Sequence, residues 1–508
     1  MKNQDDSFIT FVMYHALFGK KLYENETAEI MFETYIPENV FGVFSTIRRK
    51  EVIQVDIDIH GCIGYWEKNF NTMMKHDVYL NVLQVSYDSL WSDNRRNSFP
   101  PIETDPESLL ELDFMMNPIF PIDKQTGMIT ISTFKNVIFS NNVYGIIIQS
   151  KDKKQKATYL PNVFKNISWD EIIVSIKQKA NIASEDYDVY AYKIKQVKAR
   201  FIDMLTSESF CFISIYHFSR LLLENMDTSL RFPFVYMYTN DGRLERNTQD
   251  DVRNIATLSD VYKYIHLFPI LRKKYRLQSD VLEKKVLEIM KNTRSFSSQS
   301  LSFLGYLYSS KKNPFKKLFC EKLTRDFSSA EKEFAQPQII IGLNEAGCHI
   351  PLDGFPYNTV NSNDSLFKMN WIIQAMVSLD KKLSRAWLMQ LDIVKKIELL
   401  LKNPETETNY LAVAFEMLCF VYASTKDAYW WNPLFSLFYE LEKRKKCHNI
   451  LYTFLNDTAR IDITGHILNG LVQMRSFVQS PSSLPLTSSS SSSSSSVPHS
   501  SMSCARRP

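Results

Sequence analysis

Apolar and polar residues alternate from residue 53 to residue 60, where the chain reads IQVDIDIH. One face of this segment is apolar and consists of Ile53, Val55, Ile57 and Ile59. The other face is polar and consists of Gln54, Asp56, Asp58 and His60. A period of two is typical of a half-buried strand. Gly-Cys-Ile-Gly follows at residues 61–64 and predicts a tight turn, because glycine tolerates positive φ.

Residues 69–91 change to helical periodicity. Their apolar positions form one stripe along a helix: Phe70, Met73, Met74, Val78, Val82 and Val85. The predicted turn therefore links a strand to a helix.

A hairpin and a second helix are predicted further along the chain. Residues 143–161 place two apolar runs around a lysine-rich tip, as a hairpin does. Ser168 and Glu171 have the spacing of a capping box. The helix that they open turns its isoleucines inward, namely Ile172, Ile173 and Ile176. Residues 1–205 are thus predicted to form an α+β or α/β domain with an antiparallel or mixed sheet.

Residues 206–476 carry long stretches with helical periodicity, separated by short loops. The clearest stretches are residues 279–292, 365–379, 384–403, 409–425 and 432–446. They predict an all-helical domain built from antiparallel hairpins. The tail, residues 477–508, is rich in serine and cannot bury enough apolar surface to offset its ordering entropy, so it is predicted to be disordered.

Composition narrows the class of protein. A hydrophobic fraction of 44% and a charged fraction of 23% are those of an ordinary globular chain. The net charge of +4 requires no polyanionic partner, so nucleic acid is not the expected ligand. The chain shows no secretory signal pattern, and no apolar run approaches the roughly 18–20 residues that span a bilayer. A soluble protein without a membrane partner is predicted.

The seven cysteines are scattered and include no CxxC pair, so no disulfide framework is predicted. A cytoplasmic or nuclear location is the simplest interpretation. Two Cys-His dipeptides, Cys348-His349 and Cys447-His448, lack a second pair at metal-ligand spacing, and no metal or cofactor is predicted.

Six segments of the first 200 residues occur in an order that resembles a known family. They read GVFSTIRRK, IHGCIGYW, DNRRNSFPPI, VYGIIIQS, ATYLPNVF and SWDEIIVSIKQKA. The resemblance is to the AMMECR-type domain family, named after the Alport syndrome, midface hypoplasia and elliptocytosis candidate region. It implies two α/β subdomains with an Arg-Gly-Cys-Ile-Gly signature lining the cleft between them. Here His60 replaces the arginine of that signature, which puts in doubt any role that needs a permanent charge.

The resemblance leaves the activity of the domain open. Prokaryotic members are similar to proteins encoded beside Memo-type dioxygenase-like and radical-SAM proteins, which implies a redox or modification role. Animal members are implicated as interaction proteins. The protein is therefore either an enzyme that uses the cleft or a scaffold protein, and both alternatives stay open.

Cys62 and His60 are the candidate catalytic pair. A turn before a helix N-terminus would lower the pKa of the Cys62 thiol, and His60 would act as its base if extended geometry brought the two side chains to one face. The alternatives are that Gly61 and Gly64 only permit the turn while Cys62 packs as a small apolar residue, or that Cys62 contacts a ligand without covalent chemistry.

Asp93 with Arg95 or Arg96 is a candidate binding group, because a guanidinium offers two donors to an anionic ligand. A surface salt bridge that holds the loop is equally consistent with these residues. Which of the two arginines corresponds to that of the family segment is open.

The helical half weakly resembles the hairpins of α/α-toroid proteins, through the extended segment, Asp-Gly turn and helix of residues 231–265. In a toroid, Asp241, Arg253, Asn254 and Glu345 would face a central cavity that suits a carbohydrate-like or isoprenoid-like ligand. Gly342 and Gly347 would allow close packing of the helix that carries Glu345. An ordinary helical bundle or solenoid is the alternative.

Overall fold

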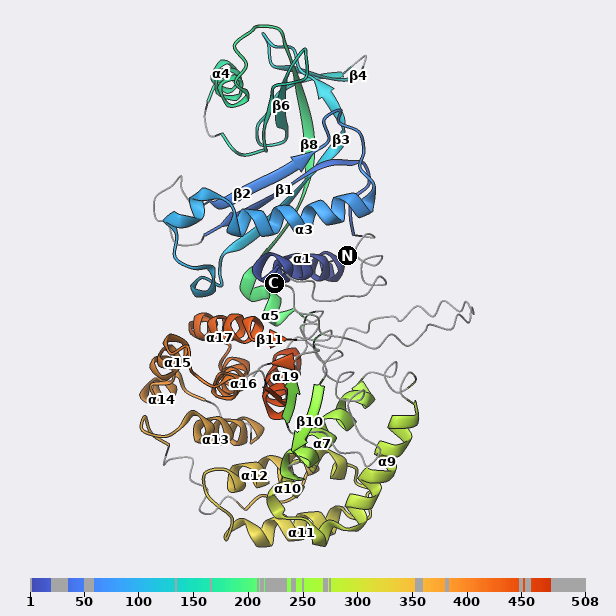
Figure 1. Cartoon of the computed structure of the whole chain (residues 1–508), viewed down its shortest axis with the longest axis vertical. Helices are drawn as coiled ribbons and strands as arrows, with labels where there is room; N and C mark the ends of the chain where they lie inside the picture. Colours follow the sequence, from blue (N-terminus) through green and yellow to red (C-terminus); the bar gives the residue numbers. More distant parts are fainter. Residues whose placement is uncertain are drawn as a thin grey trace. The chain divides into compact units, whose positions relative to one another are not determined.

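The fold is described from a computed structural model of the chain. It describes residues 2–19, 35–49, 59–132, 135–164, 167–207, 210, 214, 235–238, 244–248, 251–267, 273, 276–351, 360–379, 383–446, 451–452 and 458–476. Residues 53–58 of the predicted strand, the predicted tail from residue 477, Asp241 and the Cys447-His448 pair lie outside these residues. The chain divides into two compact units, Met1–Met204 and Leu205–Pro508 (Figure 1).

The first unit is an α+β fold around one antiparallel sheet. Its helices are α1 (Lys2–Phe18), α3 (Lys75–Trp91), α4 (Trp169–Ala180) and, at its end, α5 (Phe201–Thr206), with 3₁₀ turns η1 (Asn94–Ser98) and η2 (Ile102–Thr104). Its strands are β1 (Val40–Arg48), β2 (Ile59–Trp66), β3 (Leu109–Pro121), β4 (Met128–Ser132), β5 (Lys135–Ile138), β6 (Gly145–Ser150), β7 (Lys156–Tyr159) and β8 (Tyr187–Arg200).

Six of these strands form a sheet in the order β2-β1-β3-β8-β6-β7, with every neighbouring pair antiparallel. Helix α3 packs along β1 and β2, and α1 packs on α3, as Figure 1 shows. Helix α4 covers β6 and β7. The sheet therefore carries helices at both of its ends.

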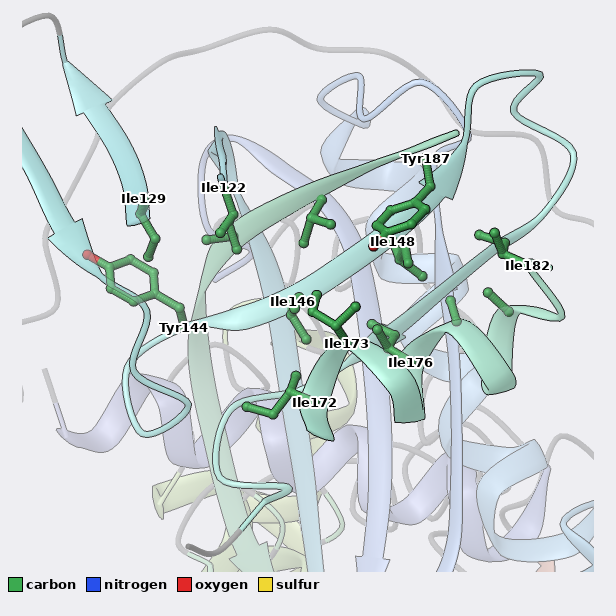
Figure 2. Close-up of a cluster of buried hydrophobic side chains, with 14 residues drawn as sticks. Ile122, Ile129, Tyr144, Ile146, Ile148, Ile172, Ile173, Ile176, Ile182 and Tyr187 are labelled. Carbon is green, nitrogen blue, oxygen red and sulfur yellow. The ribbon is translucent and has the colours of Figure 1, made fainter. Parts of the chain in front are cut away.

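The core under α4 follows from the pattern of the sequence. Figure 2 shows Ile172, Ile173 and Ile176 directed at Ile146 and Ile148 of β6. The predicted capping box forms, because the Ser168 side chain accepts from the Glu171 N–H while the Glu171 side chain accepts from the Ser168 N–H. The predicted hairpin is confirmed as β6 and β7, paired antiparallel.

The predicted turn at residues 61–64 is wrong. These residues lie inside β2, paired with β1 from Gly61 opposite Ile47 to Gly64 opposite Phe44. Helix α3 begins only at Lys75, so no helix N-terminus follows the signature directly. The glycines are needed instead because neighbouring atoms leave no room for a side chain. A Cβ at Gly61 would lie 1.8 Å from the Ser89 carbonyl oxygen. A Cβ at Gly64 would lie 2.2 Å from the Phe44 ring.

The second unit is largely helical. Its longer helices are α7 (Asp251–Leu267), α9 (Arg276–Lys291), α11 (Lys316–Phe327), α12 (Ala335–Ala346), α13 (Leu366–Ser378), α15 (Ile393–Lys402), α16 (Thr408–Thr425), α17 (Trp431–Lys443) and α19 (Ile461–Ser476). Shorter ones are α10 (Ser298–Ser302), α14 (Arg385–Gln390), η3 (Thr293–Ser295), η4 (Gly305–Tyr308) and η6 (Ala428–Trp430). Short strands are β9 (Val235–Tyr238), β10 (Leu244–Thr248), β11 (Lys445–Lys446), β12 (Leu451–Tyr452) and β13 (Thr458–Arg460).

Most predicted helical stretches are confirmed, and one is divided. Residues 384–403 form α14 and α15 rather than one helix, because Asp392 adopts a left-handed φ of 52° between them. Gly342 permits close packing as expected, since its Cβ would lie 2.3 Å from the Ser302 carbonyl oxygen. Gly347 instead ends α12 with a φ of 65°.

Pairwise packing in this unit links α7 to α10, α10 to α12, α12 to α13, α13 to α16, α16 to α19, and α19 to α7. The α/α toroid itself stays a prediction. Within the described residues, no helix combines the length and the apolar character needed to cross a membrane.

The α4 core gives a first stability prediction. Ile176 is fully buried, whereas Val174 on the same helix is 55% exposed. We expect Ile176→Ala to lower the free energy of unfolding by about 2–5 kcal/mol, because it loses apolar burial and leaves a cavity. Val174→Ala serves as the control and should change it by less than about 0.5 kcal/mol. Urea unfolding followed by circular dichroism measures both, and equal losses would show that α4 does not pack as described.

Candidate functional site

The strand register assigns a set of polar side chains to one face of the sheet. Ser45 of β1 contacts Ser89 of α3, with 3.1 Å between the hydroxyl oxygens, so the odd positions of β1 face the helices. The neighbouring Thr46 therefore faces away from them. Thr46 stands opposite Cys62 on β2 and Glu111 on β3. We call this surface the helix-free face.

The helix-free face continues across all six strands. Residues paired across strands lie on the same face of the sheet. Asp113 on β3 pairs with Gln196 on β8, so both lie on the helix-free face. Every second residue of β8 lies on this face, which places Tyr190 there together with its partner Ile147 on β6.

The sheet is curled so that its two edge strands approach across this face. Lys156 belongs to β7 and Trp66 to β2, at opposite ends of the strand order. The Lys156 Nζ nevertheless lies 4.6 Å from the centre of the Trp66 ring. The Trp66 ring in turn stacks on Phe44, with 5.8 Å between ring centroids. The helix-free face is therefore concave, with aromatic rings and lysines at its rim.

Asp113 is the titratable group at the floor of this concavity. Its side chain is buried, and Gln196 donates a hydrogen bond of 2.9 Å to it. Burial raises the pKa of Asp113 to about 6, despite the opposing hydrogen bond from Gln196. A carboxyl group with this pKa exchanges protons near neutral pH.

A hydroxyl pair lies on the same face of the sheet as Asp113. The Tyr192 hydroxyl is 2.8 Å from the Thr158 hydroxyl and donates to the Tyr159 carbonyl oxygen at 3.1 Å. Full burial raises the pKa of Tyr192, so this phenol stays protonated and acts only as a hydrogen-bonding group.

Cys62 is half-buried on the same face. The Thr46 hydroxyl donates to the Cys62 Sγ at 3.2 Å. Burial nevertheless raises the pKa of the Cys62 thiol, outweighing the hydrogen bond from Thr46 and the charge of Arg95. The predicted lowering of this pKa is thus wrong, because β2 places no helix N-terminus at the thiol. Cys62 is a protonated thiol at neutral pH.

His60 does not meet Cys62. The pairing of β1 with β2 shifts register between Ile47 and Arg48, which leaves His60 as the extra residue of a β-bulge. Its Nε2 lies 3.1 Å from the Leu90 carbonyl oxygen in α3, on the helix-covered side of the sheet. Burial lowers the pKa of His60, although the Leu90 carbonyl opposes this. The His60–Cys62 pair predicted from extended geometry is therefore not formed.

Asp93 and Arg95 hold the outer edge of β2 at Cys62. The Cys62 N–H donates to the Asp93 Oδ2 at 3.0 Å, and the Arg95 Nη2 donates to the Cys62 carbonyl oxygen at 3.3 Å. Arg95 also forms a bidentate pair with Asp93, with contacts of 3.0 and 2.5 Å. Arg95, rather than Arg96, is the arginine that acts with Asp93. The unpaired backbone of an edge strand is thereby satisfied.

The candidates of the helical unit are placed less completely. Arg253 and Asn254 lie in the first turn of α7, and the structure does not describe their side chains. Glu345 on α12 forms an ion pair of 2.9 Å with Lys263 on α7.

The cysteines of this unit correct one expectation. Cys348 forms a disulfide with Cys320, with 5.7 Å between their Cα atoms, although no disulfides were predicted. A zinc-ligand role for Cys348 is thereby excluded. Among the described residues, no group of three or more His, Cys, Asp or Glu side chains is arranged to hold a metal ion.

Sequence reasoning missed three residues of the concave face, namely Asp113, Lys156 and Lys179. Lys179 on α4 donates to the Thr158 carbonyl oxygen at 2.9 Å, and its charge acts on Cys62. No local motif marks these residues. Only the alternation of β3 and β7, combined with the pairing of strands distant in sequence, would have indicated them.

The first unit is thus an α+β domain whose curled antiparallel sheet presents a concave face around a buried carboxyl group and a thiol. Residues 13–200 match the AMMECR1 family model, so this part of the chain contains an AMMECR1 domain. No curated protein and no solved structure matches the chain.

We call the contacts of Asp93 and Arg95 with the backbone of Cys62 the edge clamp. The edge clamp predicts how the stability of the domain depends on pH. Burial alone would raise the pKa of Asp93, but hydrogen bonds from Arg95 and from the Cys62 N–H lower it to about 2. The pKa of an aspartate in the unfolded chain is about 3.9. The stabilisation that ionised Asp93 gives to the fold is therefore complete above pH 4 and is lost as the pH falls towards 2. We expect Asp93→Asn to lower the free energy of unfolding by about 1–2 kcal/mol at pH 6 and by much less near pH 2.

Unfolding curves between pH 2 and 6 measure this difference. Arg95→Ala should reproduce the loss at pH 6, and Arg96→Ala is the matched control that should not. A loss for Arg96→Ala as large as that for Arg95→Ala would contradict the assignment of the clamp.

Proposed function

We propose that the AMMECR1 domain binds and chemically modifies a small molecule on its concave face. Asp113 exchanges a proton with the substrate, and Cys62 contacts it as a neutral thiol. The observation that carries the proposal is the presence of a carboxyl group with a pKa of about 6 on the same helix-free sheet face as the thiol. Proton transfer is most effective when the pKa of the catalytic group lies near the working pH.

The charges at the rim favour a substrate with an anionic group. Lys156 and Lys179 approach the concave face from β7 and α4. Burial lowers the pKa of both lysines, so each ammonium group is incompletely solvated. A phosphate or carboxylate between them would restore the interactions lost on burial. No nucleic acid, membrane or cofactor is part of the proposal.

Two other functions from the sequence analysis remain as alternatives. One is a scaffold in which Cys62 only packs, and the other is a helical domain that binds a carbohydrate-like or isoprenoid-like ligand near Asp241, Arg253, Asn254 and Glu345. The domain division at residues 205 and 206, the disordered tail from residue 477 and the cytoplasmic or nuclear location also stay predictions.

The experiment is untargeted mass spectrometry of a small-molecule cell extract incubated with the purified full chain. We expect at least one compound with an anionic group to be converted. Conversion should fall at least about tenfold in Asp113→Asn, as is usual when a proton-transfer group is removed. Its rate should rise as the pH increases through about 6 if Asp113 acts as a base, because only the ionised carboxylate accepts a proton. Asp186→Asn, an exposed change on the same domain, is the control.

The Cys62 thiol is tested separately by alkylation with iodoacetamide from pH 6 to 10. We expect slow modification at neutral pH and an apparent pKa above that of a free thiol, about 8.5. Rapid alkylation at pH 7 would show a thiolate and overturn the assigned role. If Asp113→Asn and Cys62→Ala leave every conversion unchanged, the proposed activity does not reside on this face.

A further inference from the structure

Three hydrogen-bond donors without acceptors belong to one end of the concave face. The indole Nε1 of Trp66 and the amide Nε2 of Gln149 are withdrawn from solvent and have no hydrogen-bond partner among the described residues. The Lys156 ammonium lies on the Trp66 ring and, within the same residues, forms no hydrogen bond and no ion pair. We call these three side chains the donor cluster.

The strand register places the donor cluster on the helix-free face. Gln149 lies two residues after Ile147 on β6, so the two share that face. The Cα partner of Gln149 on β7 is Lys156. Trp66 lies four residues after Cys62 on β2 and therefore faces the same way. The 4.6 Å between the Lys156 Nζ and the centre of the Trp66 ring shows that the ends of β2 and β7 meet here.

Gln149 is the member of the donor cluster that most needs a partner. It is 5% exposed, and a buried amide N–H without an acceptor is costly to leave unpaired. Its neighbours in the sheet are Lys156, which can only donate, and Asp188 on β8. The Asp188 carboxylate is already held by Lys151 at 2.6 Å. The donor cluster therefore lacks an acceptor.

The charges around the donor cluster favour a single negative charge. Within the described part of the chain, the charged groups that act on Lys156 are Lys68 and Glu67. Two lysines thus stand beside one carboxylate, and that carboxylate also accepts from the Tyr65 hydroxyl at 3.1 Å. One uncompensated positive charge with two neutral donors suits a carboxylate, which carries one charge on two acceptor oxygens. A phosphate carries nearly two negative charges at neutral pH and would leave an excess.

We propose that the donor cluster binds the carboxylate of a small organic acid. This inference rests on the function proposed for the concave face and narrows its substrates to carboxylic acids. The Lys156 ammonium moves from the Trp66 ring to the bound carboxylate, to which the Trp66 indole and the Gln149 amide also donate. The movement gives up a cation–π contact but breaks no ion pair that the described residues form.

The position of the donor cluster also sets the shape of the acid. Trp66 and Cys62 are four residues apart on β2, which separates their Cα atoms by about 13 Å. The Phe44 ring lies between them, because it covers Gly64 and stacks on Trp66. The acid therefore has an elongated apolar body that lies on Phe44 and extends towards Asp113 and Cys62.

The test follows the Trp66 indole N–H directly. The full chain, with ¹⁵N-labelled tryptophan, is titrated with 3-phenylpropionate at pH 7 and observed by NMR, and Trp66→Phe identifies the Trp66 signal by its loss. We expect that signal to move downfield and to saturate, because the indole gains a charged acceptor. 3-Phenylpropan-1-ol has a similar shape without charge and should not move it.

Variants separate the donor cluster from general attraction of anions. Lys156→Gln should weaken binding of 3-phenylpropionate at least about tenfold, because it removes the charged donor. Gln149→Met has a similar volume without the amide and should weaken binding severalfold. Lys154→Gln removes the same charge from the same hairpin, at a lysine that is 82% exposed, and should leave the affinity unchanged.

Three results would overturn the inference. These are an unmoved Trp66 signal, the same affinity in Lys156→Gln as in the native chain, and binding of phenyl phosphate as tight as that of 3-phenylpropionate. Failure of the proposed function is recognised differently. Binding of 3-phenylpropionate at Trp66 without conversion of any compound would contradict that function and support the donor cluster. Conversion that requires Asp113 but proceeds equally well in Lys156→Gln would contradict the donor cluster alone.

Discussion

The pairing of β8 with two different strands is the constraint on which the AMMECR1 domain depends. Along its length, β8 pairs first with β6 and then with β3, so one continuous backbone fixes the register of both halves of the sheet. A shift by one residue would exchange the two faces of the sheet. Asp113 would then face the helices, and the apolar residues that pack under α3 and α4 would face solvent. The concave face is thus a consequence of the same register that builds the core.

Burial raises the pKa of a carboxyl group, whereas hydrogen bonds to the carboxylate lower it. The balance of these two effects gives the carboxyl groups of this protein different roles. Asp93 is partly buried but receives donors from Arg95 and Cys62, so it stays ionised and holds an edge strand. At Asp113 the effect of burial is larger than that of its hydrogen bond, which raises the pKa towards neutrality. The number of hydrogen-bond donors therefore distinguishes the carboxylate that stays ionised from the one that titrates near neutral pH, because both are partly removed from bulk water.

The histidine at position 60, where the resemblance to the family implies an arginine, has a physical explanation in this chain. His60 lies beside Arg49, which is itself buried and whose pKa is lowered by that burial. A neutral imidazole adds no further cation there, whereas a guanidinium would place a second permanent charge in the same interior. The His60 ring also packs on Phe99, with 5.5 Å between ring centroids. The residue thus supports the junction of β2 with the loop after α3 rather than the thiol.

The sequence by itself determined the elements whose signals are local. The capping box of α4, the hairpin of β6 and β7, and the helical stretches of the second unit were predictable because their periodicity and end signals lie within about 20 residues. The order of six segments likewise indicated the family. Only the tertiary structure decided the site. Gly61 and Gly64 suggested a turn. They are glycines because Ser89 and Phe44, from other elements, lie too close to leave room for a side chain. Asp113 and Lys179 join Cys62 only through strand pairing and curl, which are properties of distant contacts that no local pattern encodes.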